Sequence, residues 1–142
     1  MKNIYEFIPV SNKLDKYYNN DKSVLTLTYD EKHLLRNAVF PQTLKRIIFE
    51  YDVIYSDIIH ANFPTSVYSL QFSCNFDVSL VNNLPENIEE LVFLQLSVEI
   101  HHLLFYIKRI VVLCNTMHAV ENYIKKVPFG CVVTDGNGKI YL

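Results

Sequence analysis

The feature that most constrains this chain is a pattern that recurs about every twenty residues. Each copy begins with a proline, and apolar residues follow at the third, sixth and eighth places after it. The three clearest copies are Pro41-x-x-Leu44-x-x-Ile47-x-Phe49, Pro64-x-x-Val67-x-x-Leu70-x-Phe72 and Pro85-x-x-Ile88-x-x-Leu91-x-Phe93. Self-similarity at such a period is the sequence sign of an architecture in which one small unit stacks on the next. The pattern predicts how the chain is built and indicates no chemical task.

Weaker copies extend the pattern over most of the chain. A degenerate first copy has Asp21 in the place of proline, followed by Val24, Leu27 and Tyr29. A chain of 142 residues is long enough to bury one core and is one domain by length. We expect an N-terminal cap over 1–20, a repeat solenoid over 21–130 and a C-terminal hairpin over 131–142. The copies begin near 21, 41, 64 and 85, with weaker copies at 104 and 121.

Each copy ends in an alternation of the form apolar-x-apolar, as in Ile47-Ile48-Phe49. Such alternation is typical of a short strand that turns one face inward. One strand per copy, stacked in parallel, predicts a mainly β fold, a short parallel-strand solenoid. The predicted core consists of the apolar positions of the three clear copies: Leu44, Ile47, Phe49, Val67, Leu70, Phe72, Ile88, Leu91 and Phe93.

An alternative concerns residues 86–127, which contain neither proline nor glycine. One long helix within this span would make the fold α+β. Strict alternation over Leu94–Ile100 favours strands instead. Both states remain open for this part of the chain.

The C-terminal end carries a hairpin signal. Asp135-Gly136-Asn137-Gly138 separates two apolar runs, 131–134 and 139–142. Such turn residues accept the backbone angles that tight hairpins need. A hairpin here would pair with the last strand and cap its edge.

Part of the third copy and the start of the fourth resemble a known repeat. The residues Phe76-Asp77, Leu80 and Leu84-Pro85 match the FNIP repeat, a leucine-rich-repeat-like unit of about twenty-two residues. That family is common in social amoebae and in the giant viruses that infect amoebae. The match covers roughly residues 21–95, and the second copy departs from it with Val53 in the place of the phenylalanine. The resemblance implies a leucine-rich-repeat-like interaction scaffold, not an enzyme.

Composition narrows the function classes. The net charge of −2 gives no electrostatic reason to bind nucleic acid or an anionic membrane. Three widely spaced cysteines suit a reducing interior better than a disulfide framework. We therefore expect a cytoplasmic protein, in the host cytoplasm if the chain is viral, with a protein partner. No catalytic constellation is apparent, and we expect no cofactor, small-molecule substrate, nucleic acid or membrane partner.

A second function class remains open in the C-terminal half, a small ligand- or metal-sensing domain. Its candidate ligands are Glu99, His101, His102, Cys114 and His118. Their spacing matches no common zinc finger, and ligands must converge in space to hold zinc. A polar loop with scattered surface histidines accounts for them equally simply.

The partner surface follows from strand alternation. If Ile47 and Phe49 point inward, Arg46 and Ile48 point to the outer face of the sheet. The same register predicts ten outer residues: Thr26, Thr28, Arg46, Ile48, Ser69, Gln71, Glu90, Val92, Arg109 and Val111. Three of them, Ile48, Val92 and Val111, are apolar, and adjacent exposed apolar side chains tend to mark contact sites.

Overall fold

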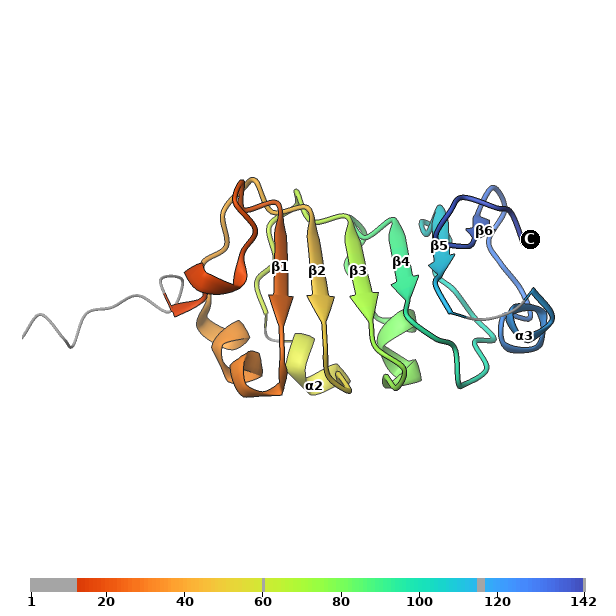
Figure 1. Ribbon diagram of the computed structural model, residues 1–142, viewed down its shortest axis with the longest axis horizontal. Helices are drawn as coiled ribbons and strands as arrows, with labels where there is room; N and C mark the ends of the chain where they lie inside the picture. The colour runs from red at the N-terminus through yellow and green to blue at the C-terminus, as the bar shows by residue number, and fades with distance from the viewer. Residues whose placement is uncertain (1–12, 60, 115–116, 142) are drawn as a thin grey trace, which may run out of the picture.

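The computed structural model describes residues 13–59, 61–114 and 117–141, and their centre is one sheet of six parallel strands. The strands are β1 (Val24–Leu27), β2 (Arg46–Phe49), β3 (Ser69–Phe72), β4 (Glu90–Phe93), β5 (Arg109–Val112) and β6 (Val132–Thr134). Each strand pairs with the next one in the chain, so sequence order and spatial order coincide (Figure 1). The mainly β prediction is confirmed.

Short helices complete the fold. They are the 3-10 helices η2 (Asp15–Tyr17), η3 (Tyr29–Asn37) and η4 (Val78–Asn82), and the α-helices α2 (Tyr55–Ile58) and α3 (Met117–Tyr123). Figure 1 shows α2 and α3 at the end of the sheet toward which the strand arrows point. The alternative of a long helix within 86–127 is wrong, because that span contains β4, β5 and only the seven-residue α3. None of the described helices is long and apolar enough to cross a bilayer.

The recurring proline marks a tight turn that enters each strand. Its carbonyl oxygen accepts a hydrogen bond from the backbone N–H three residues later. This bond joins Pro41 to Leu44, Pro64 to Val67 and Pro85 to Ile88, at 3.0–3.1 Å. Leu104 makes the same bond to Ile107, although it lacks the ring, so the turn and not the proline is what recurs. Proline suits the position because it holds its predecessor extended and gives up no ladder bond there.

The inner side of the sheet is the core. Leu25, Ile47, Leu70, Leu91, Ile110 and Val133 form one ladder across all six strands, and all are fully buried. Beside them Phe49, Phe72 and Phe93 stack, with ring centroids 6.0 and 5.7 Å apart. The nine predicted core residues are all buried, and that prediction is confirmed.

The first copy begins two residues earlier than the sequence pattern predicts. The turn that enters β1 joins Asn19 to Lys22, not Asp21 to Val24. Leu25 therefore takes the ladder position, while Val24 faces outward and Tyr29 is exposed. Asp21 resembles the prolines only in spacing. Its carboxylate accepts hydrogen bonds from the Ser23 backbone and hydroxyl, which is ordinary turn chemistry.

The fifth and sixth copies differ in outcome. The strand of the fifth is β5, with Ile107, Ile110 and Val112 buried as its pattern predicts. The prediction that a sixth copy begins at Glu121 is wrong, because the helix α3 extends to Tyr123. The last turn instead joins Pro128 to Cys131, and β6 follows one residue sooner than in the other copies. Gly130 has φ +79° in this turn, a conformation that glycine adopts without strain.

Both edges of the sheet carry an antiparallel segment. At β1 a bridge joins Tyr18 to Leu25. At β6 a bridge joins Thr134 to Ile140, and the Tyr141 N–H donates to the Val133 carbonyl. The turn at 135–138 thus lies where the hairpin was expected, but its first arm is itself the last parallel strand. In the predicted N-terminal cap, residues 1–12 lie outside the described residues.

Candidate functional site

The outer side of the sheet presents two rows of side chains, set by the parallel register. The polar row contains Val24, Arg46, Ser69, Glu90, Arg109 and Val132. The apolar row contains Thr26, Ile48, Gln71, Val92, Val111 and Thr134. In Figure 1 no helix lies in front of β1–β4. Nine of the ten predicted partner residues lie in these two rows, since β-strand alternation decides the side.

Thr28 is the exception. It comes one residue after β1, and its hydroxyl donates to the Glu31 carboxylate at the start of η3. Thr28 lies just past the end of β1 and not within it, because the first copy was aligned two residues late. Thr26 stays on the outer face because a shift of two preserves the side of a strand.

The polar row is a connected network around Glu90. Arg46 donates to Glu90 Oε1 from Nη2 at 2.8 Å and to Ser69 Oγ from Nε at 3.1 Å. Ser69 Oγ in turn donates to the same Glu90 oxygen at 2.7 Å. Arg109 Nε lies 3.7 Å from Glu90 Oε2 on the other side. A buried carboxylate is tolerated when cationic and hydrogen-bonding groups satisfy it. Here two arginines, from β2 and β5, and one serine hydroxyl, from β3, surround Glu90.

This network makes Ser69 and Glu90 poor partner contacts. Both side chains are buried, and their hydrogen-bonding atoms already face each other. Their action is to orient Arg46 and Arg109, whose side chains remain partly exposed. Of the predicted residues in the polar row, the two arginines are thus the accessible ones.

The apolar row is less accessible than its composition predicts. Val92 is 4% exposed and Val111 is 8% exposed, whereas Ile48 is half-buried. Val92 is flanked by Gln71 and Val111 on strands about 4.8 Å away, so its neighbours cover it. The expectation that Val92 and Val111 are exposed contact residues is therefore wrong.

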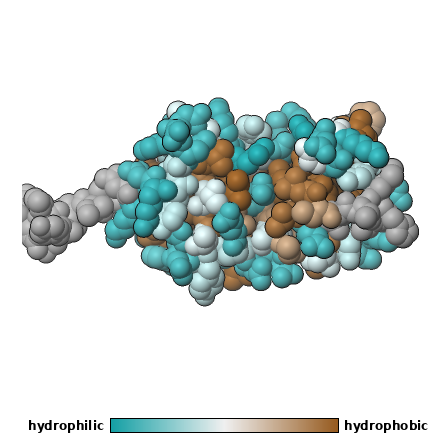
Figure 2. All heavy atoms as spheres, viewed as in Figure 1, coloured by the Kyte–Doolittle hydropathy of each residue, from teal (hydrophilic) through white to brown (hydrophobic). Residues whose placement is uncertain are grey.

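Accessible apolar surface lies instead just past the strands. We call Thr28, Glu50, Ser73, Leu94 and Leu113, which directly follow β1–β5, the post-strand row. Leu94 is 37% exposed and Leu113 is 40% exposed. Figure 2 shows hydrophobic residues gathered over β4 and β5. Of this row the sequence analysis predicted only Thr28. The other members differ in residue type from copy to copy, so no repeated pattern marks them.

A hollow of about 330 Å³ joins the apolar row to the post-strand row. Ile48 and Leu94 supply apolar walls, and Glu50, Gln71 and Ser73 supply polar groups. Ser73 Oγ donates to the Tyr51 carbonyl at 3.1 Å and is occupied within the fold. For the Glu50 carboxylate and the Gln71 amide, no side-chain hydrogen bond or ion pair is found within the described residues. Two unengaged polar groups thus border an apolar depression.

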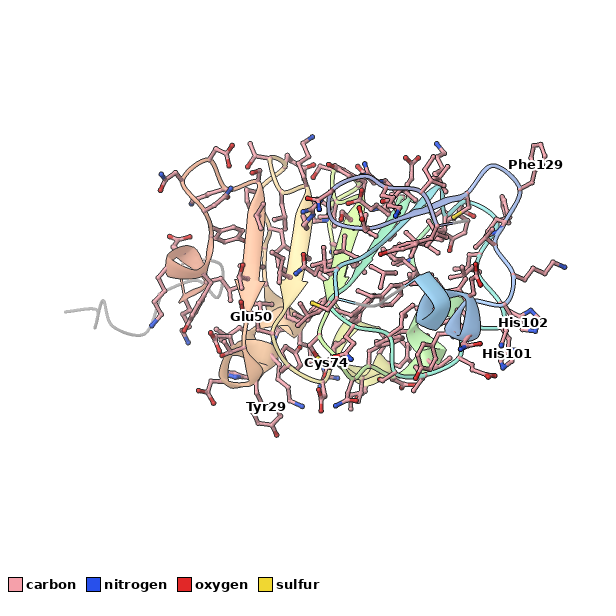
Figure 3. All side chains as sticks on the ribbon, turned by 45° about the vertical axis from the view of Figure 1, so that its right-hand side comes forward. Tyr29, Glu50, Cys74, His101, His102 and Phe129 are labelled. Atoms are coloured by element: carbon pink, nitrogen blue, oxygen red, sulfur yellow. The ribbon has the colours of Figure 1, made fainter. Side chains whose placement is uncertain are left out.

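Among the side chains that the structure describes, those of the metal alternative do not form a metal centre. His101 Nε2 lies 3.0 Å from Glu99, and His101 and His102 border a small hollow with Lys126. Figure 3 shows the two histidines side by side at the periphery. Cys114 is exposed after β5, and the side chain of His118 lies outside the described residues. No three His, Cys, Asp or Glu side chains in the described ranges could share an ion.

A second exposed apolar feature lies at the opposite end of the strands. Phe105 and Phe129 occupy the same place in consecutive entry turns, directly after Leu104 and Pro128. Both are strongly exposed, and Phe129 projects from the edge of the molecule in Figure 3. The earlier copies have Gln42, Thr65 and Glu86 at this place. An alignment of the entry turns of all copies would have identified Phe105 and Phe129 from the sequence.

Comparisons with protein-family models, curated protein sequences and solved structures found no match to this chain.

Proposed function

We propose that this chain is a non-enzymatic protein-interaction scaffold that holds its partner on the outer face of the sheet. The observation that carries the proposal is the accessible apolar surface of Ile48, Leu94 and Leu113, on the same side of the sheet as the buried Val92 and Val111. Apolar groups grouped on one face favour contact with another molecule, since their burial releases water.

The rigidity of the sheet supports this proposal. The contact residues stand on or directly after strands whose inner side chains are fully buried. A surface held in this way loses little conformational entropy when a partner binds. Arg46 and Arg109 border the same surface and are aimed by Glu90. Charges at the border of an apolar surface set partner orientation and association rate more than affinity.

The proposal includes a leucine-rich-repeat-like solenoid of FNIP repeats. It is supported by the one-to-one order of copies, turns and strands. It is also supported by the Phe76-Asp77 pair, whose aspartate ties two copies together. Asp77 Oδ1 accepts from the Ser79 N–H at 3.0 Å, and Oδ2 accepts from the Tyr55 N–H at 3.3 Å. A hydrogen bond from the Ser79 hydroxyl at 2.8 Å, together with these two backbone bonds, holds the pKa of Asp77 below its usual value.

The test is a double substitution, Ile48→Asp with Leu94→Asp. Leu94 is chosen and not Val92, because an aspartate at a buried valine would unfold the sheet for reasons unrelated to binding. Proteins captured from amoebal lysate by the immobilised wild-type chain would be compared by quantitative mass spectrometry with those captured by the variant. We expect the specific partner to be lost while the circular dichroism spectrum and melting temperature are retained.

The matched control is Phe105→Asp with Phe129→Asp, which places two charges on the exposed turns at the other end of the strands. We expect this control to retain the partner. If the control loses the partner and the outer-face variant keeps it, the outer face is the wrong surface. The aromatic turns would then be the contact.

A further inference from the structure

We propose that the hollow bounded by Ile48, Glu50, Gln71 and Leu94 takes an extended partner segment that carries one large apolar side chain and a nearby lysine or arginine. This inference rests on the proposed function and specifies the partner chemistry. It commits to a peptide segment with a basic residue. A small molecule or a second copy of this chain is not the occupant.

The apolar part follows from the size and walls of the hollow. Its volume of about 330 Å³ lies near the lower limit of the roughly 300–1,000 Å³ that small-molecule pockets have. Such a space accommodates one large side chain more readily than a cofactor. Ile48 and Leu94 flank it from β2 and from the residue after β4, so an inserted side chain would contact aliphatic carbon on two sides.

The extended backbone follows from Gln71. Its side-chain amide carries a donor and an acceptor. No other residue that the structure describes forms a hydrogen bond with either group. A peptide unit of an extended segment offers one N–H and one C=O that match such an amide. A partner that covered Gln71 without bonding to it would leave a polar group unpaired, which disfavours purely apolar occupants.

The basic residue follows from Glu50. This carboxylate is exposed, borders the same hollow and has no cationic partner in the described ranges. By contrast, Glu89, directly before β4, is paired with Lys108 at 2.9 Å. Two strand spacings of about 4.8 Å separate Glu50 from Leu94 across the sheet. A lysine or arginine within three positions of the apolar anchor reaches that far.

The charge of Glu50 makes the inference testable by reversal. The wild-type chain and the Glu50→Lys variant would each select from a phage-displayed library of random nine-residue peptides. We expect the wild type to enrich an aliphatic or aromatic residue with Lys or Arg within three positions. We expect Glu50→Lys to keep the apolar residue and enrich Asp or Glu in place of the base.

The affinity of one selected peptide, measured by fluorescence anisotropy, gives the size of the contribution that Glu50 makes to binding. An exposed ion pair contributes modestly to binding, and the substitution converts attraction into repulsion, so Glu50→Lys should weaken binding of a basic peptide about threefold to tenfold. Glu86→Lys makes the same charge change at an exposed turn at the other end of the strands. That control should leave binding within twofold of wild type.

Four outcomes would overturn the inference. The first is that the enriched peptides lack the base, and the second is that Glu50→Lys and Glu86→Lys behave alike. The third is that the library yields nothing beyond a bare-resin selection. The fourth is that the chain self-associates in sedimentation analysis and dissociates on Leu94→Asp, so that a second copy fills the hollow. In the first case, loss of peptide binding on Leu94→Asp would still support the outer face as the binding surface, so the two proposals fail separately.

Discussion

The two sides of the sheet use alternate residues of the same six strands, yet they differ in how uniform they are. On the inner side every strand contributes an aliphatic residue to the ladder from Leu25 to Val133. On the outer side the equivalent rows mix charge, amide and apolar groups, as in Arg46, Gln71 and Val92. Stacked copies must pack against one another on the inside, so packing leaves little choice there. The outer side is free to differ, and the features particular to this chain lie on it.

The largest effect that would test this contrast is on the inner side. Leu70→Ala should lower the free energy of unfolding by about 2–5 kcal/mol, because Leu70 is fully buried between Ile47 and Leu91 and its loss leaves a cavity. Ile48→Ala, in the neighbouring strand but on the outer side, should cost below about 1.5 kcal/mol. Urea denaturation followed by circular dichroism measures both. Equal losses would show that the outer side packs as tightly as the inner side.

A smaller effect tests whether part of the outer side is structural. Glu90→Ala should cost about 1–3 kcal/mol, since it removes the acceptor shared by Ser69 and Arg46. Arg109→Ala is the matched control from the same network. At 3.7 Å and half-exposed, Arg109 should contribute below about 1 kcal/mol. Urea denaturation followed by circular dichroism measures both changes in the free energy of unfolding. A negligible change for Glu90→Ala would mean that the network only orients the arginines.

The smallest effect appears only in alkaline solution. Burial, with Asp15 nearby, raises the pKa of Tyr18 from 10.0 to about 12, and burial, with Asp57 and Glu31 nearby, raises the pKa of Tyr51 further still. The unfolded chain loses these protons near pH 10 while the folded chain keeps them. Stability should therefore be unaffected by these groups below pH 10 and fall above it, progressively for Tyr18 until about pH 12.

Tyr51→Phe provides the comparison for this pH effect. The Tyr51 hydroxyl is buried without a hydrogen-bond partner among the described residues, so its removal should not destabilise the chain at pH 7. The alkaline decrease in melting temperature should become smaller in this variant. An unchanged decrease between pH 10 and 12 would show that Tyr51 ionises as easily in the folded state as in the unfolded state.

Much of the inner side was predictable from local pattern. The spacing of Leu44, Ile47 and Phe49 after Pro41 identified a strand and its buried side without other information. The prediction succeeded at Leu104, which lacks the proline ring, but it failed at Asn19, where the first turn begins two residues early, and where one residue was missing before β6. An alignment by spacing alone cannot detect such shifts, because turn hydrogen bonds and not residue types set the start of each strand.

The candidate site was predictable only in part. Alternation correctly assigned Arg46, Ile48 and Gln71 to the outer side, but it missed Glu50 and Leu94. Those two residues lie after the strands, where no periodic pattern constrains them. Their place in one hollow depends on two strand pairings between residues about twenty apart in the chain.

By itself the sequence determined which residues of each clear copy face the core, because a strand alternates its sides and the apolar positions repeat. Only the tertiary structure decided which outer residues solvent can reach. Val92 lies in β4, and Leu94 directly follows that strand two residues later. Val92 is nevertheless only 4% exposed, whereas Leu94 is 37% exposed. The difference comes from neighbours on adjacent strands, which cover the middle of the sheet and leave its end open.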